Sequence, residues 1–156
     1  MARFAHSLKE SGIGAGDRVV GYMPNMIETV IAMLAATSLG ATWSSCATDI
    51  GPAAAVERLG QVEPKTMITA DGYFYKGKAF DTLEHAAEVA RGIPSLKKVI
   101  VVSYTRERPD ISRIPDSVHY AGFLSNEKDL EIQFEQLPFS HPLYIMFSSG
   151  TTGKPK

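Results

Sequence analysis

The sequence lacks the features that mark secreted, membrane and nucleic-acid-binding proteins. Its single cysteine, Cys46, cannot form a disulfide within the chain, so a reducing compartment is compatible with it. A formal net charge of −1 provides no basic field for nucleic acid. The uncharged stretch 29–48 is strongly apolar only over residues 30–36, far short of the roughly 20 residues of a membrane span. Residues 1–12 contain no apolar core of a secretory signal.

Residues suited to metal-dependent or nucleophilic chemistry are also scarce. The four histidines, His6, His85, His119 and His141, do not have metal-ligand spacing, and no cysteine or carboxylate cluster joins them. No Ser-His-Asp arrangement can be argued. His85 is expected to pack near the apolar face of a helix. The sequence therefore predicts no metal site and no catalytic residue within this chain.

What the sequence does contain is an alternation of short apolar and longer amphipathic segments. Strands are expected at residues 18–23, 41–46, 66–70, 99–102 and 143–147. Helices are expected from the N-terminus to Ser11, at 25–39, at 52–61, from Phe80 to about Gly92, and, as a short one, around 128–136. This alternation predicts βαβ units, and hence an α/β fold with a parallel sheet.

Local patterns add detail to three of these segments. Asn25 and Glu28 have the spacing of a capping box at the start of the second helix. An apolar stripe on that helix is expected to face the core; it consists of Ile27, Val30, Ile31 and Leu34. Residues 72–78 are expected to form an aromatic and basic loop, and residues 103–142, interrupted by prolines, to be mostly irregular.

The last predicted strand runs directly into a loop of glycine and hydroxyl side chains, SSGTTGKPK. Glycines let the backbone approach an anion, amides and hydroxyls donate hydrogen bonds to it, and Lys154 adds a positive charge. The spacing excludes a Walker A motif, because only two residues separate Gly150 from Gly153 and Pro155 follows the lysine. On composition alone, phosphate binding and a flexible polar turn both remain open.

Three segments resemble the adenylate-forming superfamily, which includes acyl-CoA synthetases, luciferases and the adenylation domains of peptide synthetases. Residues 148–156, SSGTTGKPK, resemble its phosphate-loop signature, and GDRVVGYMP at 16–24 and IAMLAATSLGAT at 31–42 resemble segments that precede that loop. Residues 43–51, WSSCATDIG, and 58–65, RLGQVEPK, are most similar to the acetoacetyl-CoA synthetases within that superfamily. Acetyl-CoA synthetases are close relatives, so a ligase of another short acid is the alternative.

The resemblance implies a reaction and two groups of binding residues. Such enzymes use ATP with Mg²⁺ to convert a carboxylate, here acetoacetate, into an acyl-adenylate with release of pyrophosphate, and CoA then displaces AMP. By similarity, the ATP phosphates would be held by Ser148, Ser149, Gly150, Thr151, Thr152, Gly153 and Lys154. A basic segment of the acetyl-CoA synthetases contacts the CoA nucleotide, and the residues at its place here are Tyr75, Lys76 and Lys78. Tyrosine stands where arginine would be expected, and a surface turn with solvated lysines is the alternative.

The resemblance covers the whole chain but only part of such enzymes. We expect residues 1–156 to be a partial AMP-binding N-terminal domain, truncated at both ends and without the C-terminal domain. The complete parent is expected to be a cytosolic acid–CoA ligase, whereas this chain alone is expected to be inactive. Exposed sheet edges would favour self-association. The alternatives are a non-catalytic short product that binds a partner and a stand-alone nucleotide-binding module.

Overall fold

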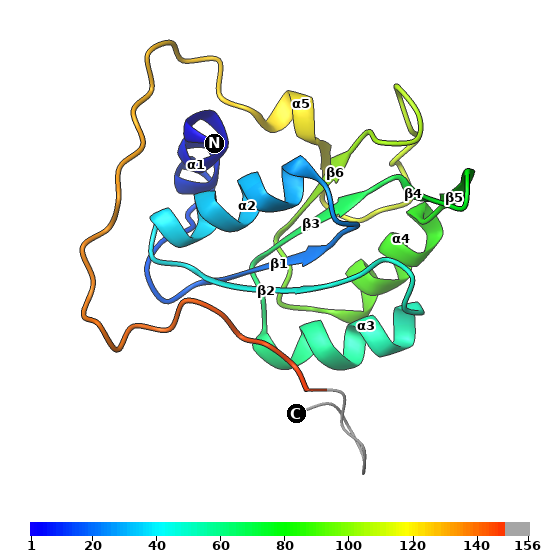
Figure 1. The fold of residues 1–156 in the computed structure, drawn as a ribbon, viewed down its shortest axis with the longest axis horizontal. Helices are drawn as coiled ribbons and strands as arrows, with labels where there is room; N and C mark the ends of the chain where they lie inside the picture. The colour runs from blue at the N-terminus through cyan, green and yellow to red at the C-terminus, as the bar shows by residue number, and fades with distance from the viewer. Residues whose placement is uncertain (149–156) are drawn as a thin grey trace.

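The computed structural model describes residues 1–148 and shows a parallel sheet with helices on both faces (Figure 1). Five strands lie in the order β2-β1-β3-β6-β7, and every neighbouring pair is parallel. Their bounds are β1 (Arg18–Tyr22), β2 (Thr42–Cys46), β3 (Thr66–Ala70), β6 (Lys98–Val102) and β7 (Ser117–His119). The predicted α/β fold with a parallel sheet is therefore confirmed.

The helices form one layer on each face of the sheet. One layer contains α1 (Ala2–Glu10), α2 (Ile27–Ser38) and the short α5 (Tyr120–Phe123). The other contains α3 (Pro52–Leu59), which continues into the 3-10 turn η1 (Gly60–Val62), and α4 (Leu83–Gly92). Successive strand residues point to opposite faces, so Val19 packs in the first core and Val20 in the second. Burial on both faces explains why β3 contains no charged residue and why β6 is apolar after Lys98.

Residues 72–81 form a β-hairpin, so the expectation of a loop at 72–78 is wrong. Strand β4 (Gly72–Tyr75) pairs antiparallel with β5 (Lys78–Asp81), and the rings of Tyr73 and Phe80 stack across the pair at 5.2 Å. The two turn residues both have positive φ, 48° at Lys76 and 75° at Gly77, which is the backbone geometry of a type I′ hairpin turn. Phe80 belongs to β5, so helix α4 begins only at Leu83.

Helix α2 forms where expected but faces the core with different residues. The residue that precedes its first turn is Met26, and no side chain caps that turn, so the predicted capping box is wrong. The buried face consists of alanines, Ala32, Ala35 and Ala36, whereas Ile27 is 74% exposed. Alanine lets the helix backbone approach its neighbours closely. Of the predicted stripe, Ile31 packs against this core, whereas Val30 and Leu34, like Ile27, are exposed.

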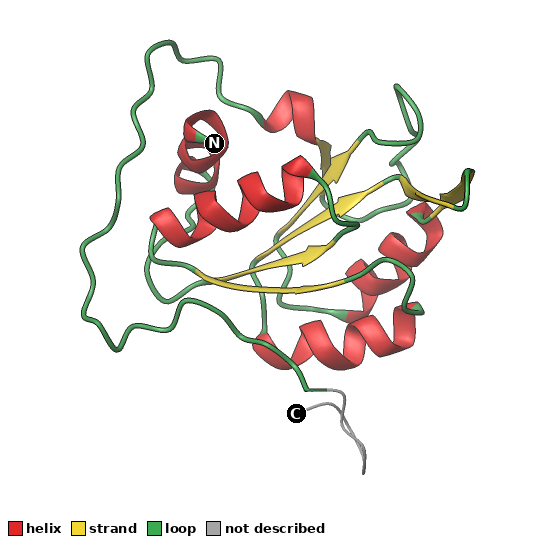
Figure 2. Cartoon of the chain, viewed as in Figure 1, coloured by secondary structure: helices red, strands yellow, loops and turns green. Residues whose placement is uncertain are grey.

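Residues 124–142, which follow α5, form a long irregular segment that we call the strap (Figure 2). A short helix was expected around 128–136, but the strap contains none there. Asp129 has φ of 57°, which is incompatible with a helix at that residue. The strap runs beside α1 and α2 instead, where the Glu135 amide donates to the Ser38 carbonyl and the His141 ring lies 2.8 Å from the Gly40 carbonyl. Strand β7 and helix α5, which precede the strap, were not predicted.

The segment after the strap joins the β2 edge of the sheet through a single bridge. Tyr144 pairs in parallel with Trp43, and two backbone hydrogen bonds flank this bridge at 3.0 and 2.9 Å. A strand was predicted at 143–147, but within these residues the structure forms only this one bridge. None of the helices within residues 1–148 has the length and apolarity needed to cross a membrane.

Candidate functional site

The strand order reverses at β1, and this reversal marks the edge at which a ligand site is expected. The chain passes from β1 to β2 on one side and then returns to place β3 on the other side. The crossover after β1 carries α2 on one face, and the crossover after β2 carries α3 on the other. In open α/β sheets, ligands bind outside the carboxyl ends of the strands at such a switch point.

A cavity of about 480 Å³ lies at this carboxyl edge, and we call it the edge pocket. Its walls come from the segments that follow four strands of the sheet. Pro24 and Asn25 follow β1, and Tyr104 follows β6. The remaining lining residues are Ala47, Thr48 and Asp49 after β2, and Tyr73, Phe74 and Tyr75 on the hairpin after β3. Only the fold brings these residues together.

The wall formed by residues 47–49 is held from inside the sheet by Tyr22. This side chain is fully buried, and its hydroxyl donates to the carbonyl oxygens of Ile50 at 2.6 Å and Thr48 at 3.3 Å. Burial, together with the nearby Cys46 and Asp49, raises the pKa of Tyr22 to about 12, so the hydroxyl keeps its proton at neutral pH. Burial also raises the pKa of the Cys46 thiol to about 12, which makes this cysteine a poor nucleophile.

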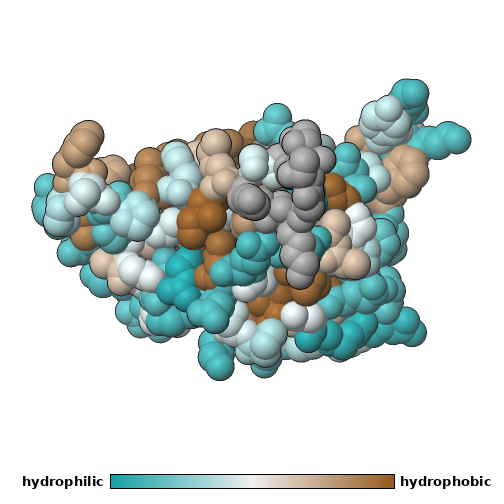
Figure 3. Space-filling model, turned by 90° about the horizontal axis from the view of Figure 1, so that it is seen from below, coloured by the Kyte–Doolittle hydropathy of each residue, from teal (hydrophilic) through white to brown (hydrophobic). Residues whose placement is uncertain are grey.

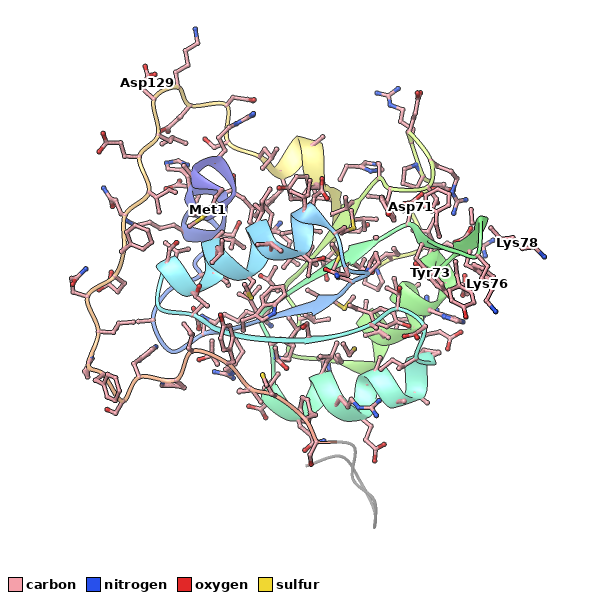
Figure 4. All side chains as sticks on the ribbon, viewed as in Figure 1. Met1, Asp71, Tyr73, Lys76, Lys78 and Asp129 are labelled. Atoms are coloured by element: carbon pink, nitrogen blue, oxygen red, sulfur yellow. The ribbon has the colours of Figure 1, made fainter. Side chains whose placement is uncertain are left out.

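The opposite wall is the aromatic hairpin, which contains the residues predicted to bind CoA. Tyr75 lines the edge pocket, whereas Lys76 and Lys78 lie at the exposed hairpin turn beside it (Figure 4). The Lys76 ammonium nitrogen lies 5.3 Å from the centre of the Tyr75 ring, within cation–π distance. Phe74 meets Tyr104 edge to face, with ring centres 5.4 Å apart. The pocket thus combines aromatic rings with one cation, Lys76, beside a lining ring, whereas Lys78 projects outward from the hairpin (Figure 4).

Sequence reasoning found only part of this site. It singled out Tyr75 but missed Asn25, Thr48 and Tyr104, because each follows a different strand. Their position directly after predicted parallel strands is the signal that could have found them. His85 was expected to be packed, but it is exposed on α4. Within residues 1–148, no group of histidine, cysteine and carboxylate side chains is arranged to hold a metal ion.

The predicted phosphate loop begins at the end of the described region. Ser148 is exposed and follows the segment that runs parallel to β2, so it lies toward the carboxyl edge of the sheet. The other predicted phosphate-binding residues lie outside the described residues; they are Ser149, Gly150, Thr151, Thr152, Gly153 and Lys154. Their role therefore remains a prediction.

Known proteins similar to this chain agree on one family. The sequence model of the AMP-binding enzyme family matches residues 1–156. Acetoacetyl-CoA synthetase of Danio rerio is 48% identical over the whole chain, and acetoacetyl-coenzyme A synthetase of Rhizobium meliloti is 43% identical. This chain spans 24% of the length of each of these relatives.

A solved structure gives the same result for the fold. Acetoacetyl-CoA synthetase from Streptomyces lividans superimposes with a TM-score of 0.88 and 39% identity, over 99% of this chain and 23% of that one. The sequence similarity and the shared fold both extend over essentially all of the 156 residues. The chain therefore belongs to the AMP-binding enzyme family.

Proposed function

We propose that this chain is part of an acetoacetate–CoA ligase. In the complete protein, acetoacetate attacks the α-phosphate of ATP to give an acyl-adenylate and pyrophosphate, and the CoA thiol then forms acetoacetyl-CoA and releases AMP. The observation that carries this proposal is the similarity of the entire chain to acetoacetyl-CoA synthetases of animals and bacteria. We infer a cytosolic location for the complete enzyme from the same resemblance.

Residues 148–154 are proposed to hold the ATP phosphates and the departing pyrophosphate. Glycine amides and the hydroxyls of Ser148, Ser149, Thr151 and Thr152 would donate hydrogen bonds to the phosphate oxygens. Lys154 would oppose the negative charge that develops as pyrophosphate leaves. The Mg²⁺ that such a reaction requires would enter with ATP.

This role has a direct test in the complete protein. Changing Thr152 and Lys154 together to alanine should slow ATP–pyrophosphate exchange by at least about a hundredfold, because donors aimed at developing charge are each worth this much. Arg108→Gln, an exposed change far along the sequence, is the control and should leave exchange unaltered. Unchanged exchange in the double variant would refute the phosphate-binding role.

The edge pocket is proposed to receive the nucleotide part of CoA. Adenine would stack on the Tyr75 ring at the wall of the pocket, and Lys76 and Lys78 on the same exposed hairpin would pair with phosphates. The position of the pocket at the switch point of the sheet supports this assignment. Lys76→Glu should lower the affinity for CoA, because it replaces an attraction to phosphate by a repulsion. An unchanged affinity would reject the role.

The substrate assignment is tested by an acid-by-acid screen of the complete protein. AMP formation should show the highest kcat/KM with acetoacetate. A preference for acetate or another short acid would favour the alternative of an acetyl-CoA synthetase-like ligase.

We propose that residues 1–156 are part of the N-terminal, AMP-binding domain and do not catalyse the overall reaction alone. The phosphate loop without the acyl pocket and the C-terminal domain would lack most of the groups that stabilise the transition state. CoA-dependent formation of AMP from ATP and acetoacetate by the purified chain would contradict this.

Exposed apolar surface favours a second, non-catalytic role as a partner-binding product. Figure 3 shows apolar surface on the side where α3 and the C-terminal segment lie, and Leu143, Tyr144 and Met146 of that segment are exposed. Self-association through this surface should appear as concentration-dependent mass in sedimentation experiments. A monomer at high concentration would argue against it.

A further inference from the structure

The carboxylate of Asp71 is completely buried at the point where β3 leaves the sheet. It accepts hydrogen bonds from the amides of Tyr104 at 2.6 Å and Thr105 at 2.9 Å, and from the Thr105 hydroxyl at 2.7 Å. Burial opposes its ionisation, but the hydrogen bonds from Thr105, Tyr104 and Arg106 together hold the pKa of Asp71 below its usual value. The residue that begins the hairpin is thereby tied to the loop after β6.

Arg106 extends this connection to the far strand of the hairpin. Its guanidinium lies 3.5 Å from the Asp71 carboxylate and 2.5 Å from that of Asp81, the last residue of β5. Gly72 lets the segments approach this closely, since a Cβ there would lie 2.3 Å from the Phe80 carbonyl oxygen. We call Asp71, Arg106 and Asp81 the hairpin clamp; Figure 4 shows Asp71 at the base of the hairpin.

The hairpin clamp joins two segments whose aromatic rings line the edge pocket. Phe74 comes from the hairpin and Tyr104 from the loop after β6, and these rings meet edge to face. The amide of Tyr104 is one of the two that donate to the Asp71 carboxylate, so the clamp sets the backbone position of Tyr104 directly. The clamp and this ring contact therefore act together to connect the hairpin to the loop after β6.

We propose that Asp71 and Arg106 are positioning residues for the ligand of the edge pocket. They hold the aromatic wall in its ligand-ready shape, so that binding does not have to order the hairpin and its side chains. This inference rests on the proposed function, because it takes the nucleotide part of CoA as the ligand. Arg106 itself is half exposed and belongs to neither hydrophobic core, so its role is separable from global stability.

Arg106→Gln is the sharpest variant, because it leaves Asp71 with its hydrogen bonds from Tyr104 and Thr105. Arg108→Gln is the matched control, since it removes the same charge from an exposed residue of the same loop. By calorimetry on the complete protein, Arg106→Gln should weaken CoA binding about fivefold to tenfold, the effect of having to order one or two side chains. Arg108→Gln should change it less than about twofold, and Arg106→Lys, which keeps the charge without the planar fork, should fall between.

Two further measurements separate positioning from other effects. Proton NMR should show the Phe74–Tyr104 ring contact in the unmodified chain and its loss in Arg106→Gln, without any ligand. Urea unfolding should have nearly the same midpoint in both. If both glutamine variants weaken CoA binding equally, Arg106 acts only through its long-range charge. If the urea midpoint of Arg106→Gln drops strongly, Arg106 is a structural residue. Either result would overturn the proposal.

Failure of the proposed CoA-binding role would give results that differ from failure of the positioning role. If the unmodified complete protein does not bind CoA, the CoA role of the pocket is wrong, and the NMR contact alone then decides whether the clamp orders the wall. A ring contact that persists in Arg106→Gln would overturn the positioning role even if CoA binds well.

Discussion

The sheet and the strap that follows α5 differ in how their backbone groups are hydrogen-bonded and in where their apolar side chains lie. In the sheet, backbone hydrogen bonds pair neighbouring strands, and side chains alternate between two cores. The strap (residues 124–142) has no such strand pairing. Isolated contacts, such as the hydrogen bond from the Glu135 amide to the Ser38 carbonyl, hold it instead. Its aromatic residues remain outside, with Phe134 65% exposed. Apolar residues thus stabilise this fold only where their spacing matches a surface that can receive them.

The largest expected effect on the free energy of unfolding comes from a substitution in the buried sheet. Ile100 is completely buried between β3 and β7, so Ile100→Ala should lower the free energy of unfolding by about 2–5 kcal/mol through lost burial and the cavity left behind. Urea unfolding of the two proteins measures this difference. A loss below about 1 kcal/mol would mean that the site collapses or that the sheet is looser than described.

A smaller effect is expected where the core meets the edge pocket. Tyr22→Phe keeps the buried ring but removes the hydroxyl that holds residues 48–50, and should cost about 1 kcal/mol at neutral pH. It should also weaken CoA binding if that loop forms part of the site.

Tyr22→Phe should also change how the stability of the protein depends on pH above about pH 9. The pKa of Tyr22 is raised to about 12 in the folded protein, from an ordinary value near 10. Its contribution to stability is therefore present below pH 10 and is lost as the pH rises toward 12, because the unfolded chain releases the proton first. Cys46, raised from about 9 to about 12, adds to this loss. Stability measured from pH 9 to 12 should fall less steeply in Tyr22→Phe; equal slopes would contradict the assignment.

The smallest effect is expected from the strap. Phe134→Ser removes an exposed ring and should change the free energy of unfolding by less than about 0.5 kcal/mol. Urea unfolding beside Ile100→Ala gives the contrast under identical conditions. A loss comparable to that of the core variant would show that Phe134 is covered in solution, for example by a second copy of the chain.

The sequence predicted the sheet far better than the strap or the site, for physical reasons. Strand β3 was predicted at its observed bounds, because burial on both faces leaves an apolar run between turn residues. The hairpin was missed because Lys76-Gly77 suggests a turn without revealing that Tyr73 and Phe80 would pair across it. On α2, only Ile31 of the predicted stripe packs against the core, since close packing selected alanine for the buried face.

The site was less predictable than the fold because it is assembled from strand ends. Resemblance pointed to Tyr75, but Asn25 and Tyr104 reach the same pocket only through the strand order. The hairpin clamp was also invisible, because Asp71 and Arg106 are separated by the whole of the hairpin, α4 and β6. Such contacts depend on tertiary structure and leave no periodic trace in the sequence.

Strand β2 fixes the distance between the points at which the two proposed binding regions are attached to the sheet. Its carboxyl end leads into residues 47–50 of the edge pocket, and its Trp43 bridges to Tyr144, in the segment that leads to the phosphate loop. The offset between these attachments is therefore a backbone length, about 10 Å for the three residues from Trp43 to Cys46. Inserting or deleting one residue within β2 would change this offset by about 3.3 Å and would also turn the side chains that follow to the opposite face of the sheet.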